Sequence, residues 1–361
     1  MTTAIAFLIF GLVLLVFSAD WLVKGAASIA STLGISPLIV GLTVVAFGTS
    51  APELAVSTMS AFKGQADLAV GNVIGSNIFN ILVILGISAL IIPLIVHQQL
   101  IRFDLPVMIF LSVLIYVLSF DGAISRIDGI ILFSLALAYV GFLVRQSKKE
   151  KDAGVLSENE EEFGQAGKDP KWVKNIALVI FGIAGLVAGS DRLVFGAVYI
   201  AREFGVSELI IGLTIVSLGT SLPEVATSVL AALKGERDIA VGNVVGSNIF
   251  NIVTVLGISS IVSPAGIAVA KEALDFDMLV MIAVALAALP IFFYGYRIGR
   301  VSGFFFLIFY AAYISHLLLD ATGNPALAPY RHVMLVFVTP AVGLALLVLL
   351  FRAIFQSKNP A

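Results

Sequence analysis

The sequence has no cysteine, only three histidines and few charged residues, which make up 12% of its 361 residues. Without cysteine, the chain can form no disulfide, thiolate nucleophile or cysteine-ligated metal site. The histidines, at positions 97, 316 and 332, are too scattered along the chain to suggest a zinc centre. Soluble domains are about 25% charged. The composition therefore excludes an ordinary globular enzyme, a disordered chain and a nucleic-acid-binding protein.

Apolar residues are abundant instead, at 60% of the chain, and the mean hydropathy is +1.08. The apolar runs are long and continuous and do not alternate every second residue, which favours helices over barrel strands. At about 20 residues per span, they predict an all-α polytopic membrane protein. We expect eleven spans, at residues 4–30, 38–61, 67–92, 104–119, 127–145, 172–201, 207–232, 238–263, 276–294, 302–319 and 333–355.

The longest polar stretch, residues 145–174, has basic ends around an acidic patch and predicts a flexible linker at 147–171. Its seven Lys and Arg residues favour the cytoplasmic side. The N-terminus then lies outside, the C-terminus lies inside, and 14 of the 21 basic residues are cytoplasmic. We expect a multi-pass protein of the plasma or inner membrane.

An internal repeat is the strongest pattern in the chain. Residues 35–88 read ISPLIVGLTVVAFGTSAPELAVSTMSAFKGQADLAVGNVIGSNIFNILVILGIS. Residues 206–259 read VSELIIGLTIVSLGTSLPEVATSVLAALKGERDIAVGNVVGSNIFNIVTVLGIS. The offset is 171 without a gap, and 34 of 54 positions are identical. Asp20 and Asp191 head the two copies, and we expect them to be paired structural residues beside Lys24 and Arg192.

Each copy holds five spans, and an odd number places the second copy upside down relative to the first. This is the inverted-repeat plan of secondary transporters, which bind substrate at the midplane. We expect a first five-helix repeat at residues 1–146, the linker at 147–171, a second and inverted repeat at 172–320, and one additional C-terminal helix with its tail at 321–361.

Glu53 and Glu224 lie deep inside the second and seventh expected spans, and no Lys or Arg precedes either within ten residues. An ionised carboxylate at that depth costs several kcal/mol unless it is paired or solvated. Two glutamates in identical settings favour ion binding over simple packing. Thr49 and Ser50 share a helix face with Glu53, and Pro52 breaks the backbone ladder there. Such freed carbonyls can line an ion site. The second copy repeats this pattern with Thr220, Ser221, Pro223 and Glu224.

The repeated GNVxGSNIFN segments add a polar stripe to the third and eighth spans. Four of its residues are expected to ligate ions: Ser76, Asn80, Ser247 and Asn251. Asn77 and Asn248 lie a quarter-turn away and are expected only to form interhelical hydrogen bonds. The combined set offers carboxylate, hydroxyl, amide and carbonyl oxygens without sulfur or imidazole. It favours a hard cation such as Ca²⁺, which takes 6–8 oxygens.

Over residues 1–320, these paired GTSxPE and GNxxGSNI motifs closely resemble the sodium/calcium exchanger family, especially its compact prokaryotic members. The resemblance implies ten core helices in two inverted halves and electrogenic exchange of several Na⁺ for one Ca²⁺. It also implies sliding of the first and sixth helices across a fixed eight-helix core. The partners it implies are Ca²⁺ and Na⁺ as substrates and the lipid bilayer; no cofactor is implied.

The family's ligands can be placed on this sequence. Glu53 and Glu224 resemble the central calcium ligands, together with the backbone carbonyls of Thr49 and Thr220, and Asn80 resembles a central polar ligand. One flanking sodium site resembles a group formed by Ser50, Ser76 and the carbonyl of Ala46. The other resembles a group formed by Ser221, Ser247 and the carbonyl of Ser217.

The sequence departs from the family at Asn251, where many relatives, including potassium-dependent ones, carry Asp. Asparagine removes a third carboxylate, so we expect weak or absent potassium dependence.

Several alternatives remain at this stage. The same glutamates could bind H⁺ in a proton/calcium exchanger, or another divalent cation could be exchanged. The hydroxyl-rich flanks favour sodium. A channel is disfavoured because no TVGYG-like filter is present. An intramembrane enzyme is disfavoured because no HExxH motif is present.

Overall fold

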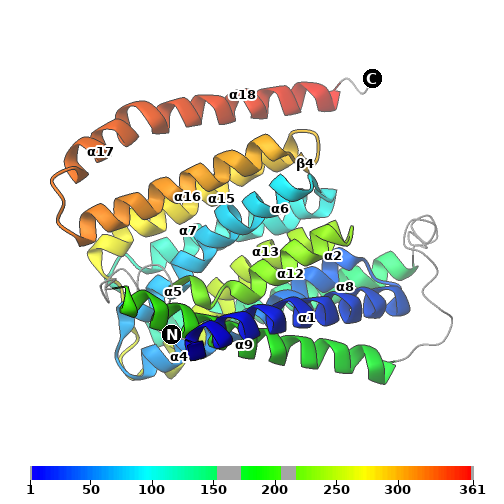
Figure 1. The fold of residues 1–361 in the computed structure, drawn as a ribbon. Helices are drawn as coiled ribbons and strands as arrows, with labels where there is room; N and C mark the ends of the chain where they lie inside the picture. The colour runs from blue at the N-terminus through cyan, green and yellow to red at the C-terminus, as the bar shows by residue number, and fades with distance from the viewer. Residues whose placement is uncertain (1, 153–171, 205–216, 359–361) are drawn as a thin grey trace.

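The computed structural model describes residues 2–152, 172–204 and 217–358. It is a bundle of long helices (Figure 1). Within the described ranges, nine helices are long and apolar enough to cross a membrane, and a bent pair makes up to ten. The polytopic all-helical prediction is confirmed. Of the expected seventh span, residues 207–216 lie outside the described ranges, and Leu222–Leu233 forms an apolar helix.

The first half begins with one long helix and ends with another. Its elements are α1 (Thr2–Leu33), α2 (Pro37–Val40), the π-helical turn η1 (Gly41–Val45), α3 (Ala46–Thr49), α4 (Ala51–Phe62), α5 (Ala66–Phe79), η2 (Asn80–Ile84), α6 (Leu85–Ile91), β1 (Leu94–Ile95), η3 (Leu100–Asp104), α7 (Leu105–Leu118), β2 (Ala123–Ile124) and α8 (Arg126–Asp152). Helix α8 thus extends past residue 147 into the expected linker, and the rest of that linker, 153–171, lies outside the described ranges.

The second half has the same order of elements and then continues into a C-terminal helix. Its elements are α9 (Trp172–Glu203), α11 (Ser217–Gly219), α12 (Leu222–Leu233), α13 (Arg237–Phe250), η6 (Asn251–Leu256), α14 (Gly257–Val262), β3 (Ile267–Ala268), η7 (Ala273–Asp277), α15 (Met278–Phe293), β4 (Arg297–Ile298), α16 (Arg300–Ala321), α17 (Leu327–Val333), η8 (Met334–Val338) and α18 (Thr339–Lys358).

Two short antiparallel ribbons join the halves. Strand β1 pairs with β4, with Leu94 opposite Ile298, and β2 pairs with β3, with Ile124 opposite Ile267. Since β1 and β3 occupy equivalent places in the two halves, as do β2 and β4, the ribbons are equivalent to each other. The two halves are therefore related by approximate two-fold symmetry.

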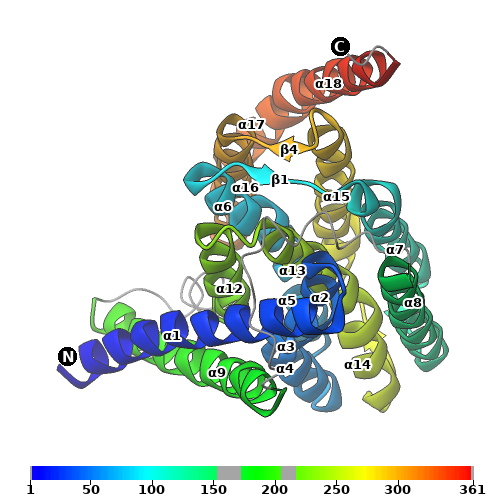
Figure 2. The ribbon, with the colours of Figure 1, turned by 90° about the vertical axis from the view of Figure 1, so that its right-hand side faces the viewer.

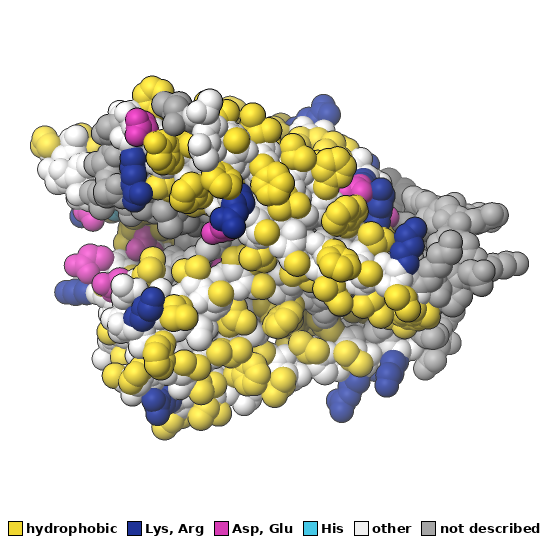
Figure 3. Space-filling view, turned by 60° about the horizontal axis from the view of Figure 1, so that its bottom comes forward, with side chains coloured by type: hydrophobic (Ala, Val, Ile, Leu, Met, Phe, Trp, Pro, Cys, Tyr) yellow, Lys and Arg dark blue, Asp and Glu magenta, His cyan; other side chains and the backbone are white. Residues whose placement is uncertain are grey.

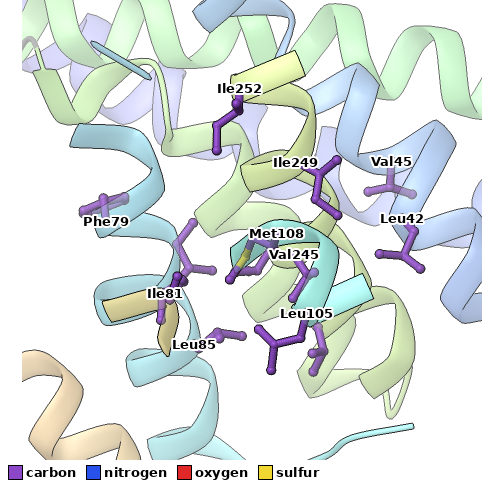
Figure 4. Close-up of a cluster of buried hydrophobic side chains, with 14 of the residues drawn as sticks. Leu42, Val45, Phe79, Ile81, Leu85, Leu105, Met108, Val245, Ile249 and Ile252 are labelled. Carbon is purple, nitrogen blue, oxygen red and sulfur yellow. The ribbon is translucent and has the colours of Figure 1, made fainter. Parts of the chain in front are cut away.

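The buried core lies between the halves. Leu42 and Val45 of η1, Met108 of α7, and Val245 and Ile249 of α13 converge in one apolar cluster (Figure 4). All five side chains are at most 3% exposed. Within the most apolar window of α13 and its continuation, 89% of the residues are buried. The buried residues of α13 include the polar residues Asn243, Ser247 and Asn248.

Helices α1 and α9 lie side by side along one edge of the bundle (Figures 1 and 2). Their glycines allow backbones to touch: a Cβ built on Gly11 would meet the Leu193 nitrogen at 2.5 Å, and one on Gly182 would meet the Leu22 nitrogen at 2.8 Å. Close approach through small residues is the usual way that helices associate in membranes.

The C-terminal helices α17 and α18 lie at the opposite edge (Figures 1 and 2). No part of the most apolar window of residues 327–352 is buried within the chain. The space-filling view shows hydrophobic side chains over the middle of one face, with most Lys and Arg side chains toward its two ends (Figure 3). This distribution matches an apolar band of membrane thickness with polar margins.

Candidate ion-binding site

Two broken helices place the glutamates at the centre of the molecule. The backbone leaves helical geometry at Ser50 (φ −80°, ψ 9°) and at Ser221 (φ −87°, ψ 4°). In the first half, the helices on either side of the break are bent by 46°. Proline occupies the first turn after each break, where its missing N–H costs nothing. The break predicted from the GTSxPE pattern is therefore present.

Glu53 and Glu224 lie in the first turns of α4 and α12, and each is 1% exposed. A helix N-terminus carries partial positive charge and exposes unpaired N–H groups, so it stabilises a nearby carboxylate. Among the described residues, neither glutamate forms an ion pair with Lys, Arg or His. Each half-helix thus favours the carboxylate form but does not fully neutralise it.

The hydroxyl donors to these carboxylates cross between the halves. Ser221 Oγ donates to Glu53 Oε1 at 3.0 Å, and Ser50 Oγ donates to Glu224 Oε1 at 3.1 Å. The second oxygen of each carboxylate, Oε2, is buried and has no hydrogen-bond partner in the described part of the chain. Each glutamate therefore has one oxygen held by the other repeat and one oxygen still free to ligate.

A pair of asparagines orients the Asn80 amide. Asn248 Nδ2 donates to the backbone carbonyl of Asn77 at 3.1 Å, so Asn248 Oδ1 must act as an acceptor. Asn80 Nδ2 donates to that oxygen at 2.9 Å. The Asn80 Oδ1 atom is left buried without a partner in the described structure. The hydrogen bonds therefore fix the orientation of the Asn80 amide, with its nitrogen bonded and its oxygen without a partner among the described residues.

The second half repeats this arrangement. Asn77 Nδ2 donates to the Asn248 carbonyl at 3.3 Å, and Asn251 Nδ2 donates to Asn77 Oδ1 at 3.0 Å. Asn251 Oδ1 is again buried and unpartnered among the described residues. Asn80 and Asn251 also open the π-helical turns η2 and η6. Such turns are frequent at functional sites because they interrupt the regular helix.

Two further asparagines hold the threonines of the broken segments. Thr220 Oγ1 donates to Asn72 Oδ1 at 3.1 Å, and Thr49 Oγ1 donates to Asn243 Oδ1 at 3.0 Å. The Asn72 amide in turn donates to Ser57 Oγ at 2.9 Å. Both threonines were expected to contribute their backbone carbonyls, and here their side chains are anchored on the opposite repeat.

The remaining predicted residues flank this centre. Ser76 Oγ is 3.1 Å from Ser221 Oγ, and Ser247 Oγ lies 3.5 Å from the Ala46 carbonyl. Both contacts cross between the halves, whereas the expected sodium groups took their hydroxyls from one half each. Ser217 begins α11, and its side chain lies outside the described part of the structure.

Four buried oxygens of these residues have no hydrogen-bond partner in the part of the chain that the structure describes: Glu53 Oε2, Glu224 Oε2, Asn80 Oδ1 and Asn251 Oδ1. All four are acceptors when the glutamates are ionised. Leaving a buried polar atom unsatisfied costs about 1–3 kcal/mol, so four such atoms together indicate a ligand that attracts acceptors. Within the described ranges, no group of three or more His, Cys, Asp or Glu side chains could hold a metal ion, and the candidate site has two carboxylates. Two carboxylates with neutral oxygens fit a hard cation that enters and leaves.

The interhelical hydrogen bonds expected of Asn77 and Asn248 are present. Sequence reasoning did not show that these two residues, together with Asn72 and Asn243, orient other residues of the candidate site. Their letter-for-letter repetition within GNVxGSNIFN was the available signal.

The sequence repeat also extends further than its ungapped segment. FDLPVMI at 103–109 matches FDMLVMI at 276–282, with an offset of 173. In each copy the Met sulfur faces an orienting asparagine: Met108 Sδ lies 3.6 Å from Asn248 Nδ2, and Met281 Sδ lies 3.7 Å from Asn77 Nδ2.

Comparisons with known proteins identify the family of this chain. The family described as "Sodium/calcium exchanger protein" matches residues 3–145 and 174–319, which together make up most of the chain. The putative antiporter CaxA of Alkalimonas amylolytica is 44% identical over 315 residues, covering 87% of this chain and 98% of its own length. The inner membrane protein YrbG of Escherichia coli is 42% identical over 295 residues, covering 80% of this chain and 89% of its own length.

A solved structure shares the fold. The sodium-calcium exchanger NCX_Mj, in crystals soaked with zero Na⁺ and Ca²⁺, superposes with a TM-score of 0.75 at 32% identity, covering 88% of this chain and 99% of the other. The sodium/calcium exchanger MaX1 of Methanosarcina acetivorans is 33% identical over 344 residues, covering 85% of this chain and 96% of its own length. The chain therefore belongs to the sodium/calcium exchanger family and is a multi-pass membrane antiporter of the cation/calcium exchanger type, not an enzyme.

Proposed function

We propose that this protein exchanges Na⁺ for Ca²⁺ across the membrane by alternating access, and that both cations compete for the central site. The observation that carries the proposal is a set of four buried oxygens that have no hydrogen-bond partner among the described residues, two from the carboxylates and two from amides that their neighbours hold in one orientation. The family membership and the solved exchanger support the same function.

Calcium is proposed to bind between Glu53 and Glu224, with the backbone carbonyls of Thr49 and Thr220. Two carboxylates offer up to four oxygens and the carbonyls add two, which reaches the lower end of the 6–8 that Ca²⁺ takes. The amide oxygens of Asn80 and Asn251 close the ring. The formal charge of the two glutamates, −2, is balanced by a single Ca²⁺.

Two sodium sites are proposed, one on each side of the calcium site. Each would be formed by neutral oxygens and one oxygen of a glutamate carboxylate. The contacts group Ser247 with the carbonyl of Ala46, and the Ser50 hydroxyl reaches Glu224 on the same side. On the other side Ser76 meets Ser221, which reaches Glu53, and the carbonyl of Ser217 is the equivalent ligand by the repeat. Each sodium site then takes ligands from both repeats.

Antiport follows from charge. One buried site with two carboxylates cannot hold Ca²⁺ and a full sodium load together, since the excess positive charge would be strongly unfavourable at low dielectric. An empty site leaves two unbalanced carboxylates near each other in the membrane interior, and this state should resist the conformational change. Only a loaded site then switches readily, which couples the two ion fluxes.

The proposed topology is two inverted five-helix repeats with one additional C-terminal helix. The two ribbons support it, because they are equivalent by the repeat, and so do the two crossed hydroxyl contacts. The proposed orientation places the N-terminus outside and the central linker and C-terminus in the cytoplasm of a plasma or inner membrane. The basic residues of the linker support that orientation.

The test is ⁴⁵Ca²⁺ uptake into proteoliposomes loaded with Na⁺, against Na⁺-free vesicles with and without a pH gradient. We expect uptake that requires internal Na⁺ and disappears in both Glu53→Gln and Glu224→Gln. Uptake that follows the pH gradient and ignores Na⁺ would replace the proposal with proton/calcium exchange at the same glutamates. If no calcium flux occurs under either gradient, the proposed ion pair is wrong, and other divalent cations are the next substrates to test.

A further inference from the structure

One ion pair ties the α1–α9 edge to the core. Lys234, which follows the last turn of α12, contacts Asp20 in the middle of α1, and Lys24 contacts the other oxygen of the same carboxylate at 2.7 Å. The Asp20 and Lys234 side chains are 25% and 26% exposed. The pair joins the first half of the chain to the second.

The repeat-equivalent pair is open. At the offset of 171, Asp20 corresponds to Asp191 and Lys234 corresponds to Lys63. Among the described residues, the only ion pair of Asp191 is with its neighbour Arg192, at 3.1 Å, and the Asp191 side chain is 69% exposed. Lys63 is exposed and forms no ion pair with any described residue. One member of a symmetric pair of contacts is thus closed while the other is broken.

Helix packing shows the same asymmetry. Helix α1 packs along α12, but α9 makes no comparable contact with α4 among the described residues. The α1–α9 interface itself is symmetric. A Cβ on Gly25 would meet the Asn175 carbonyl at 2.9 Å, and one on the equivalent Gly196 would meet the equivalent Ala4 carbonyl at 2.6 Å. The two helices therefore form one symmetric unit that is displaced to one side of the core.

We propose that Asp20–Lys234 and Asp191–Lys63 are alternative latches of the transport cycle. Because the two halves are equivalent by sequence, moving the α1–α9 unit to the other side of the core exchanges the roles of the halves. The first latch then opens as the second closes. The structure holds the state in which Asp20–Lys234 is closed. This inference concerns the conformational change and holds whichever cations are exchanged.

Such latches set the balance between states without blocking transport. A partly exposed ion pair contributes little to stability, so a substrate-loaded protein can break it. Two equivalent latches oppose each other and leave the two end states close in free energy. In the proposed orientation, Lys234 lies on the cytoplasmic side and Lys63 on the outer side. The closed latch therefore holds the unit toward the cytoplasmic end of the core.

The chain's lack of cysteine makes the test direct. Each latch is replaced by a cysteine pair, Asp20→Cys with Lys234→Cys or Asp191→Cys with Lys63→Cys, in the full-length protein in proteoliposomes. A protease site is inserted within residues 153–171. A short bismethanethiosulfonate reagent then cross-links the pair, and retention of both halves together on a denaturing gel after proteolysis reports the cross-link. Both pairs should cross-link, each cross-link should stop ion exchange, and reductant should restore it.

The two latches should exclude each other. In a variant with all four cysteines, a single chain should carry either cross-link but not both. Failure of the Asp191→Cys and Lys63→Cys pair to cross-link under conditions of active exchange would overturn the proposal. So would chains that carry both cross-links. Neither readout depends on sodium coupling, so failure of the latch and failure of the proposed function are distinguishable.

A second test removes the charge of one latch residue and measures cross-linking at the other latch. With the Lys63→Cys and Asp191→Cys reporter, Lys234→Gln should increase the rate of cross-linking roughly two- to five-fold, the size expected for loss of one partly exposed ion pair. Lys24→Gln is the matched control, because Lys24 contacts Asp20 from the same helix and does not tie α1 to the core. An equal response to both variants would contradict a latch between α1 and α12.

Discussion

The side-chain oxygen of Asn248 accepts the amide hydrogen of Asn80 at 2.9 Å, and the Asn80 oxygen is the atom left without a partner among the described residues. Asn248 is itself fixed, since its own amide nitrogen donates to the Asn77 carbonyl. Asn248 therefore orients the amide of Asn80, which we propose as an ion ligand. This relationship occurs a second time, with Asn77 orienting Asn251.

Replacing the orienting residue should weaken calcium binding without abolishing the fold. In Asn248→Leu the Asn80 amide loses its fixed acceptor and can present its NH₂ group to the cation. A buried polar group without a suitable hydrogen-bond partner costs about 1–3 kcal/mol. We therefore expect roughly ten- to a hundred-fold weaker Ca²⁺ binding, measured by titration calorimetry. Met108→Leu, which changes the other neighbour of Asn248 but conserves volume, should bind Ca²⁺ nearly as wild type. Equal losses in the two variants would show that packing, not amide orientation, matters here.

The crossed hydroxyls should be equivalent. Ser50→Ala and Ser221→Ala each remove one hydroxyl donor to the glutamate of the other repeat. Hydrogen bonds to charged groups contribute about 1.5–3 kcal/mol. We therefore expect each variant to raise the Na⁺ concentration for half-maximal exchange by about ten-fold or more, by similar factors. Ser112→Ala is the control, since the Ser112 hydroxyl is buried but bonds a carbonyl of its own helix. A strong effect in only one of the site variants would show that the sodium sites are not equivalent.

Potassium should have little effect on the wild-type protein. Asn251 supplies a neutral amide where a carboxylate would balance one more positive charge. Asn251→Asp should therefore introduce potassium stimulation of ⁴⁵Ca²⁺ uptake, measured at constant Na⁺ in vesicles with and without K⁺. Asn80→Asp is the repeat-equivalent comparison. Potassium stimulation of the wild type that Asn251→Asp leaves unchanged would contradict this assignment.

The loop between α12 and α13 should make stability depend on pH. Burial raises the pKa of the Glu236 carboxyl, Asp238 adds to the rise and Lys234 opposes it. The folded protein then binds this proton more tightly than the unfolded chain, so this contribution to stability falls as pH rises from about 4.5 through the raised pKa. Glu236→Gln should flatten that part of the profile of Tm against pH in detergent. The exposed Glu272→Gln should leave the slope unchanged.

The α1–α9 interface should not tolerate a single methyl group at its closest point. A Cβ on Gly11 would lie 2.5 Å from the Leu193 nitrogen and 2.6 Å from the Gly189 oxygen, and backbone cannot move aside cheaply. Gly11→Ala should lower Tm by several degrees and slow exchange by at least ten-fold. Gly141→Ala makes the same change in α8, where the new methyl meets no described atom within 4 Å, and it should be neutral or slightly stabilising. Normal exchange in Gly11→Ala would show that the two helices need not stay in contact.

The features that occur in both copies of the repeat could be predicted from the sequence. Glu53 and Glu224 could be found because a carboxylate in an apolar span is costly and needs a partner. The breaks at Ser50 and Ser221 followed from the proline two residues later. In the repeated GNVVG segment of α13, a Cβ on Gly242 or on Gly246 would meet backbone of residues 38–42 within 3.0 Å, so these two glycines allow close approach.

What could not be predicted depends on contacts between the halves. The resemblance to the family placed Ser76 with Ser50, whereas the folded chain brings the Ser76 hydroxyl to the Ser221 hydroxyl. The orienting role of Asn77 was missed because its partners lie more than 160 residues away. The Asp104–Tyr139 and Asp277–Tyr313 hydrogen bonds, each 2.9 Å, were missed because an offset of 173–174 interrupts the ungapped repeat.

The crossed hydrogen bonds have a consequence for how the protein is made. Glu53 is synthesised and inserted more than 160 residues before its donor Ser221 emerges, so the first half enters the bilayer with an incomplete pocket. A carboxylate without its donors in hydrocarbon is expected to take up a proton until the second half arrives. Ion recognition is thus the last property the chain acquires during biogenesis, and a truncated product cannot carry calcium on its own.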